Sequence, residues 1–149
     1  FAGVSYNPNK PLPCFHGITI NNGTSETYVE FIKKAVEVGW LTHYDIIIKD
    51  NARVHTGGAA ADLEDWLWDH EVDGRPLRIL VLYLPTRSPE LNPIELIFHV
   101  LSRRLKSEKY AVDKTLSGTE VRALVRRILN EIDVQLVANC VRHCGYNVV

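Results

Sequence analysis

Two carboxylates in this chain have neighbours that place them where chemistry could occur. Asp50 closely follows a run of three isoleucines at 46–48, and Glu95 comes shortly after a second apolar run at 79–84. Both runs are typical of buried parallel strands, whose carboxyl ends meet at one edge of a sheet and commonly bind ligands there. We therefore expect the two carboxylates to converge. Such a pair suits a hard cation such as Mg²⁺ or Mn²⁺, or an acid–base pair.

Each carboxylate also has a purely structural interpretation. Asn92, Pro93 and Glu95 match the N-cap, first and third positions of a helix, where the glutamate bonds back to the cap. Asp50 and Asn51 could form an ordinary turn after the strand, since both residue types bond nearby backbone groups. The presence of both carboxylates at one edge of a strand–helix–strand unit favours the functional interpretation.

The elements that must position these carboxylates follow from the hydrophobic pattern. Apolar stretches at 1–6 and 14–20, separated by a turn, predict an antiparallel hairpin. The two apolar runs predict a central parallel pair, buried on both faces and flanked by helices. Helical spacing predicts four helices, at 24–39, 59–69, 93–106 and, as one continuous helix, 119–145. The predicted fold class is α/β with a mixed sheet.

The composition limits the class of protein. Seventeen basic and 18 acidic residues give a net charge of −1, so the overall charge does not indicate a polyanionic partner. The charge is uneven, because 99–131 carries eight bases and four acids. A length of 149 residues predicts one domain, over 1–149. The longest apolar run is too short to span a membrane. Three cysteines without a leader predict buried thiols in a protein that is not secreted.

Two segments resemble the signatures of a known family. Segment 47–55 reads Ile-Ile-Lys-Asp-Asn-Ala-Arg-Val-His, and segment 83–95 reads Tyr-Leu-Pro-Thr-Arg-Ser-Pro-Glu-Leu-Asn-Pro-Ile-Glu. Both resemble the catalytic core of the DDE transposases of the mariner-like superfamily, in the branch whose signatures are Asp-Asn-Ala-x-x-His and Leu-Pro-x-x-Ser-Pro-x-Leu-Asn-Pro-Ile-Glu. In looser form the resemblance covers nearly the whole chain. It implies an RNase H-like fold and the metal-dependent cleavage and joining of DNA strands.

The resemblance implies roles for individual positions. Asp50 looks like the family's second catalytic aspartate and Glu95 like its final glutamate, in a site that holds two Mg²⁺ or Mn²⁺ ions. Asn51 and His55 are expected to shape the loop beside the metals, although a structural role for the histidine is also open. The first aspartate of this chain is Asp45. The family's first aspartate and its strand are therefore expected upstream, and this fragment alone is expected to be inactive.

The resemblance implies double-stranded DNA at transposon ends as the partner. His99, Arg103 and Lys106 share the face of Glu95 at helical spacing and would line a path for this DNA, unless they form only a solvated basic face. The resemblance also allows a homodimer. It implies no small-molecule cofactor, no membrane association, and a place in the nucleus or, in a prokaryote, the cytoplasm. The rival hypothesis is a non-catalytic transposase remnant that serves as a DNA- or protein-interaction module.

Overall fold

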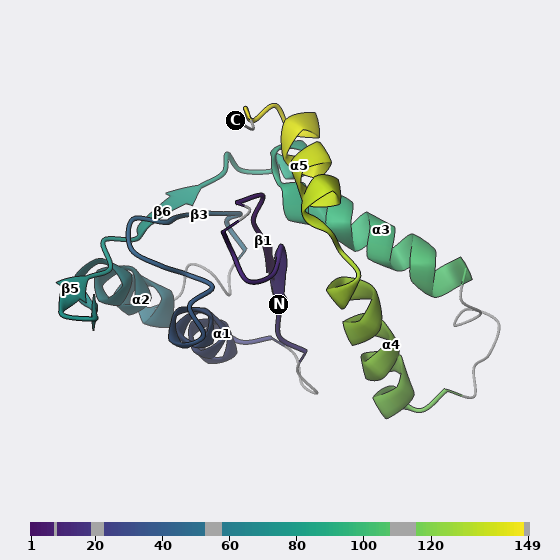
Figure 1. Cartoon of the computed structure of the whole chain (residues 1–149), viewed down its shortest axis with the longest axis horizontal. Helices are drawn as coiled ribbons and strands as arrows, with labels where there is room; N and C mark the ends of the chain where they lie inside the picture. The colour runs from purple at the N-terminus through teal and green to yellow at the C-terminus, as the bar shows by residue number, and fades with distance from the viewer. Residues whose placement is uncertain (8, 19–22, 53–57, 108–115, 148–149) are drawn as a thin grey trace. The chain divides into compact units, whose positions relative to one another are not determined.

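The computed structural model describes residues 1–7, 9–18, 23–52, 58–107 and 116–147. It is a mixed α/β structure with several small sheets, and it divides into two compact units (Figure 1). The first unit comprises residue 1 and residues 19–89, and the second comprises residues 2–18 and 90–149. That the whole chain forms a single domain stays a prediction.

The first unit begins with helix α1 (Ser25–Glu37), as the sequence predicts. Its N-terminus is closed by a capping box: Thr24 accepts from the Thr27 N–H at 3.3 Å, and Thr27 accepts from the Thr24 N–H at 2.8 Å. Gly39, with φ +72°, ends the helical stretch in the left-handed conformation that glycine tolerates. The helix buries one face, made of Tyr28, Ile32, Ala35 and Val36.

Two parallel strands follow in the first unit, and they confirm the predicted parallel pair. β3 (Ile46–Lys49) pairs with β6 (Leu80–Tyr83), so that Lys49 lies opposite Tyr83. Helix α2 (Gly58–Asp69) lies between them in the sequence and makes the strand–helix–strand unit. The carboxyl ends of both strands therefore lie at the same edge, next to Asp50.

The prediction that these strands are buried on both faces is wrong. The described part of the first unit places α1 and α2 on one face of the β3–β6 pair (Figure 1). That face holds Lys49, which is 6% exposed. The isoleucines and leucines of the other face remain about half exposed, at 44–56% for Ile46, Ile48, Leu80 and Leu82. A β-branched run identifies a strand here, but it does not tell how many layers cover it.

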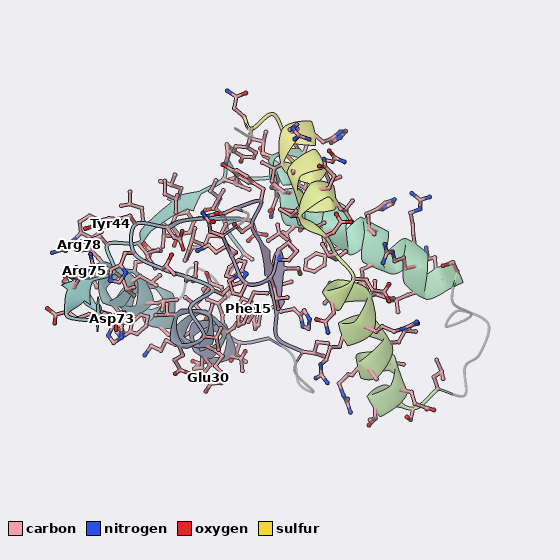
Figure 2. The ribbon with its side chains drawn as sticks, in the orientation of Figure 1. Phe15, Glu30, Tyr44, Asp73, Arg75 and Arg78 are labelled. Atoms are coloured by element: carbon pink, nitrogen blue, oxygen red, sulfur yellow. The ribbon has the colours of Figure 1, made fainter. Side chains whose placement is uncertain are left out.

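A small hairpin between α2 and β6 was not predicted. β4 (Glu71–Val72) and β5 (Arg75–Pro76) pair antiparallel across Asp73 and Gly74. Both turn residues have positive φ, +52° and +73°, as a two-residue hairpin turn of type I′ requires. Figure 2 shows the Asp73 side chain at this hairpin. No strand is predicted between the helix at 59–69 and the apolar run at 79–84, although Asp-Gly is a strong hairpin signal.

The second unit begins with the predicted antiparallel hairpin, β1 (Ala2–Val4) and β2 (Cys14–His16). Helix α3 (Pro93–Ser107) closely matches its predicted bounds. The α3 residue Ile97 is fully buried at 0% exposure. It lies in a core shared by β2, α3 and the C-terminal helices, with buried members Cys14, Ile97, Leu129, Ile132, Val137, Cys140 and Val141.

The predicted single C-terminal helix is wrong, because the structure has two. α4 (Gly118–Asn130) ends at Glu131, and α5 (Val134–His143) begins after Asp133. The Asp133 carboxylate accepts a hydrogen bond of 2.7 Å from the Leu136 N–H, which is an N-cap contact. This cap satisfies backbone groups that an unbroken helix would pair internally, and it starts a new helix.

Two expectations from composition can be compared with the described residues. Cys14, Cys140 and Cys144 are free and buried, as predicted. Burial raises the pKa of the Cys14 thiol to about 11, so it is protonated and unreactive at neutral pH. Within the described ranges, no helix combines the length and the apolar character needed to cross a membrane.

Candidate active site

Asp50 is the first residue after β3, at the carboxyl edge of the parallel pair. Its Oδ1 accepts a hydrogen bond of 3.1 Å from the Ala52 N–H, which makes an Asx turn. The structural interpretation of Asp50 as a turn residue is therefore observed. The turn also fixes the orientation of the carboxylate at the sheet edge, so the two interpretations are compatible.

Asn51 joins the ends of the two strands. Its Nδ2 donates to the carbonyl of Leu84 at 2.6 Å, and the Leu84 N–H donates to the carbonyl of Lys49 at 2.8 Å. These bonds extend the β3–β6 ladder beyond the strands and hold the chain after β6 beside the Asp50 turn. His55, the other residue expected in this loop, lies outside the described residues.

Next to Asp50 lies a cluster around the buried Lys49 side chain, which the sequence pattern did not predict. The Lys49 side chain is 5% exposed, and its Nζ lies 3.3 Å from Glu64 Oε1 on α2. The same ammonium lies 4.6 Å from the ring centroid of Tyr83 and 5.4 Å from that of Tyr28. The Tyr83 hydroxyl donates to the same Glu64 oxygen. We call Tyr28, Lys49, Glu64 and Tyr83 the Lys49 cluster.

The electrostatics of the Lys49 cluster follow from its burial. Burial lowers the pKa of Lys49, and the interaction with Glu64 opposes that shift. Burial raises the pKa of Tyr28, which the negative charges of the neighbouring acids raise further. Burial and the hydrogen bond to Glu64 raise the pKa of Tyr83 to about 12. The tyrosines are therefore neutral at pH 7, and the buried Lys49 ammonium pairs with the Glu64 carboxylate.

Glu95 lies in the first turn of α3. Its backbone N–H donates to the Asn92 carbonyl at 3.1 Å, and its side chain is exposed. Among the described residues, the Glu95 carboxylate makes no hydrogen bond or ion pair, so the capping contact with the Asn92 backbone is not observed there. The carboxylate is presented to solvent at the beginning of the helix.

Three basic residues that follow Glu95 on α3 are exposed. They are His99, Arg103 and Lys106, the three predicted DNA-binding residues. Arg104 differs from them, because its guanidinium pairs with Glu131 at 3.1 Å and so connects α3 with the end of α4. The basic residue of α3 that forms a structural ion pair is therefore not one of the three predicted DNA-binding residues.

The structure brings Asp50 and Asn51 together with the Lys49 cluster in the first unit. Glu95 and the exposed cations of α3 belong to the second unit. The sharing of one metal site by Asp50 and Glu95 therefore stays a prediction. The described residues contain no group of three or more histidine, cysteine or acidic side chains arranged to hold a metal ion.

In open α/β sheets, ligands commonly bind at the carboxyl ends of parallel strands, and the Asp50 carboxylate of this mixed α/β chain is held at such an edge. Residues 4–117 match the family model described as DDE superfamily endonuclease. This match covers well over half of the chain and includes both signature segments. The chain belongs to the DDE superfamily endonuclease family. No curated protein and no solved structure matches it.

Proposed function

We propose that this chain is the C-terminal part of the catalytic domain of a mariner-like DDE transposase, with an RNase H-like fold. It serves the metal-dependent cleavage and joining of double-stranded DNA at transposon ends. The observation that carries the proposal is the family match over residues 4–117, which includes Asp50 and Glu95 within their signature segments. The fixed carboxylate at the end of β3 gives additional support.

In this proposal Asp50 and Glu95 are metal ligands that lie within about 8 Å of each other. The donor set fits Mg²⁺ or Mn²⁺, because both groups are carboxylates and no thiolate is near Asp50 in the first unit. Bound divalent ions would supply activation of water or a 3′-hydroxyl and stabilisation of the leaving oxygen. The Asx turn holds Asp50 in place, and Asn51 holds the loop beside it.

Among the described residues, no third acidic side chain joins Asp50 in an arrangement that could hold a metal ion, and the nearby Glu64 is paired with Lys49. Asp45 is the first aspartate of the chain, but it precedes β3 and so lies at the opposite end of the strand from Asp50. Its Oδ2 accepts from the Thr42 N–H at 2.7 Å, which is a turn contact. We therefore propose that the missing aspartate lies upstream in a longer protein, and that the 149-residue chain alone does not cleave DNA.

The DNA path in this proposal follows the exposed cations of α3. His99, Arg103 and Lys106 contact phosphates rather than base edges, since their spacing follows one helix face. The salt-bridged Arg104 is not part of this path.

The test is a nicking assay on transposon-end DNA with Mg²⁺ or Mn²⁺. The 149-residue chain should be inactive, and a chain extended upstream through an aspartate-bearing strand should cleave. Asp50→Asn and Glu95→Gln should abolish cleavage by the extended chain, whereas Asp62→Asn, at an exposed acid of α2, should not. Cleavage by the 149-residue chain that follows the protein peak through repurification would contradict the proposed incomplete site.

The second candidate function is a non-catalytic remnant that binds DNA or protein. The observation that favours it is the exposed basic face of α3, because His99, Arg103 and Lys106 could bind DNA without a metal site. An extended chain that binds DNA in a salt-dependent way, but cleaves with neither metal, would support the remnant and overturn the nuclease.

A further inference from the structure

The end of α5 turns the chain back sharply. Gly145 has φ +87°, its N–H donates to the Arg142 carbonyl at 2.9 Å, and the Tyr146 N–H donates to the Val141 carbonyl at 3.2 Å. This pair of bonds is a Schellman motif, in which a glycine in the left-handed conformation follows the helix. The residue after the glycine is thereby directed to a definite place on the second unit.

That residue is Tyr146, and its hydroxyl makes a long-range contact. It donates a hydrogen bond of 2.9 Å to the carbonyl of Leu91, 55 positions away in the sequence. The side chain also packs against the core of the second unit. Burial, and to a smaller extent Cys144, raise the pKa of this phenol, so it keeps its proton and remains a donor at neutral pH.

Leu91 directly precedes the start of the helix that carries Glu95. It ends the short 3-10 helix η2 (Pro89–Leu91), and α3 starts two residues later at Pro93. The intervening Asn92 is buried, at 8% exposure, and its carbonyl accepts from the Glu95 N–H. Helix ends fray because their first N–H groups have no partner within the helix. A bond at Leu91 therefore restrains the segment whose fraying would displace Glu95.

We propose that Tyr146 is a positioning residue for the Glu95 carboxylate. Its hydroxyl fixes the entry of α3 and thus the place from which the carboxylate reaches a metal. The role of Tyr146 in metal binding rests on the proposed function. The restraint on α3 rests only on the hydrogen bond to Leu91. The family match ends at residue 117, so the contact reaches the signature segment from a part of the chain beyond that match.

The experiment compares wild type, Tyr146→Phe and the control Tyr44→Phe in the complete 149-residue chain. Tyr146→Phe removes only the hydroxyl and keeps the ring in its packing. Tyr44 is 73% exposed, so loss of its hydroxyl should change nothing. The first measurement is backbone amide exchange without metal, at 91–97 and at 137–141. The second is the Mn²⁺ dissociation constant from the electron paramagnetic resonance signal of free Mn²⁺.

Tyr146→Phe should speed exchange at 91–97 by about three- to tenfold, the factor that the loss of one ordinary hydrogen bond allows, and should leave 137–141 unchanged. The Mn²⁺ dissociation constant should rise, whereas a merely structural role would leave it unaltered. Unchanged exchange at 91–97, equal acceleration in both segments, or an unaltered Mn²⁺ constant would overturn the inference. Local acceleration in a chain whose wild type binds no Mn²⁺ would support the restraint on α3 and contradict a Mn²⁺ site shared by Asp50 and Glu95 in this chain. The nicking assay on the extended chain tests the nuclease activity separately.

Discussion

Replacing Glu64 by Gln should destabilise the first unit, because the buried Lys49 ammonium loses the carboxylate with which it forms an ion pair. Removing one partner of a fully buried ion pair costs about 3–5 kcal/mol. Here the Lys49 side chain is 5% exposed but that of Glu64 is 34% exposed, and the Gln amide oxygen still accepts hydrogen bonds. We therefore expect a loss of about 2 kcal/mol, above the value for surface pairs and below that for fully buried pairs.

The matched control is Glu37→Gln. Lys34 and Glu37 pair at 2.9 Å on α1, but both side chains are 63% exposed. Solvent screens such pairs, so this variant should lose less than about 0.5 kcal/mol. The two substitutions make the same chemical change. They differ in the burial of the ion pair and in the hydrogen bond that Glu64 accepts from the Tyr83 hydroxyl.

The assay is urea unfolding followed by tryptophan fluorescence. All three tryptophans belong to the first unit, so the signal reports that unit: Trp40, Trp66 and Trp68. In a Lys49→Met background the Glu64→Gln substitution should cost only about 0.5 kcal/mol, which gives a coupling of about 1.5 kcal/mol. A Glu64→Gln variant as stable as Glu37→Gln, or an equal loss in both backgrounds, would refute the assignment of a buried pair.

Three further predictions concern the second unit. Asp133→Ala should lose about 1 kcal/mol with the N-cap of α5, seen as a lower midpoint in thermal unfolding by circular dichroism; an unchanged midpoint would contradict the cap. The Cys14 thiol has its pKa raised from 9.0 to about 11, so above pH 9 the unfolded chain loses a proton that the folded protein keeps. Stability should therefore fall by up to about 2–3 kcal/mol between pH 9 and 11, and Cys14→Ala should reduce that fall in urea titrations; an equally steep fall in the variant would count against it. Arg103→Ala and Lys106→Ala should each weaken DNA binding across sequences and lower its salt slope by up to about one, whereas an unaltered slope in the double variant would exclude a phosphate path.

The local elements of the fold were predictable because their signals are local. Three consecutive isoleucines identify β3, Thr24 followed by Thr27 closes the start of α1, and Pro93 marks the start of α3. Each of these features depends on the backbone preferences of a few adjacent residues. Parallel pairing of the two strands is enough to predict that their carboxyl ends lie at one edge, next to Asp50.

The features that sequence reasoning missed depend on contacts between distant residues or on competition between two local signals. The helical pattern at 59–69 places Glu64 among the acidic residues of an outward face, but its carboxylate contacts Lys49, 15 positions earlier. A usable signal was present: a lysine within a strand predicted to be buried requires a nearby counter-charge. Around Asp133 the apolar residues continue at helical spacing, which predicts one unbroken helix. The Asp133 side chain instead caps the start of a second helix. The exposed face of β3 could not be predicted, because a run of apolar residues does not specify how many layers pack on it.

We propose that Asp50 and Glu95 bind the same divalent ion, and paramagnetic broadening by Mn²⁺ reports on both residues in one experiment. In nuclear magnetic resonance spectra of the 149-residue chain, Mn²⁺ should broaden the amide signals around Asp50 and around Glu95 with one common dissociation constant. Asp50→Asn should remove the broadening at both places, and Glu95→Gln should do the same. Broadening at Glu95 that persists in Asp50→Asn, or separate constants for the two places, would contradict a shared site.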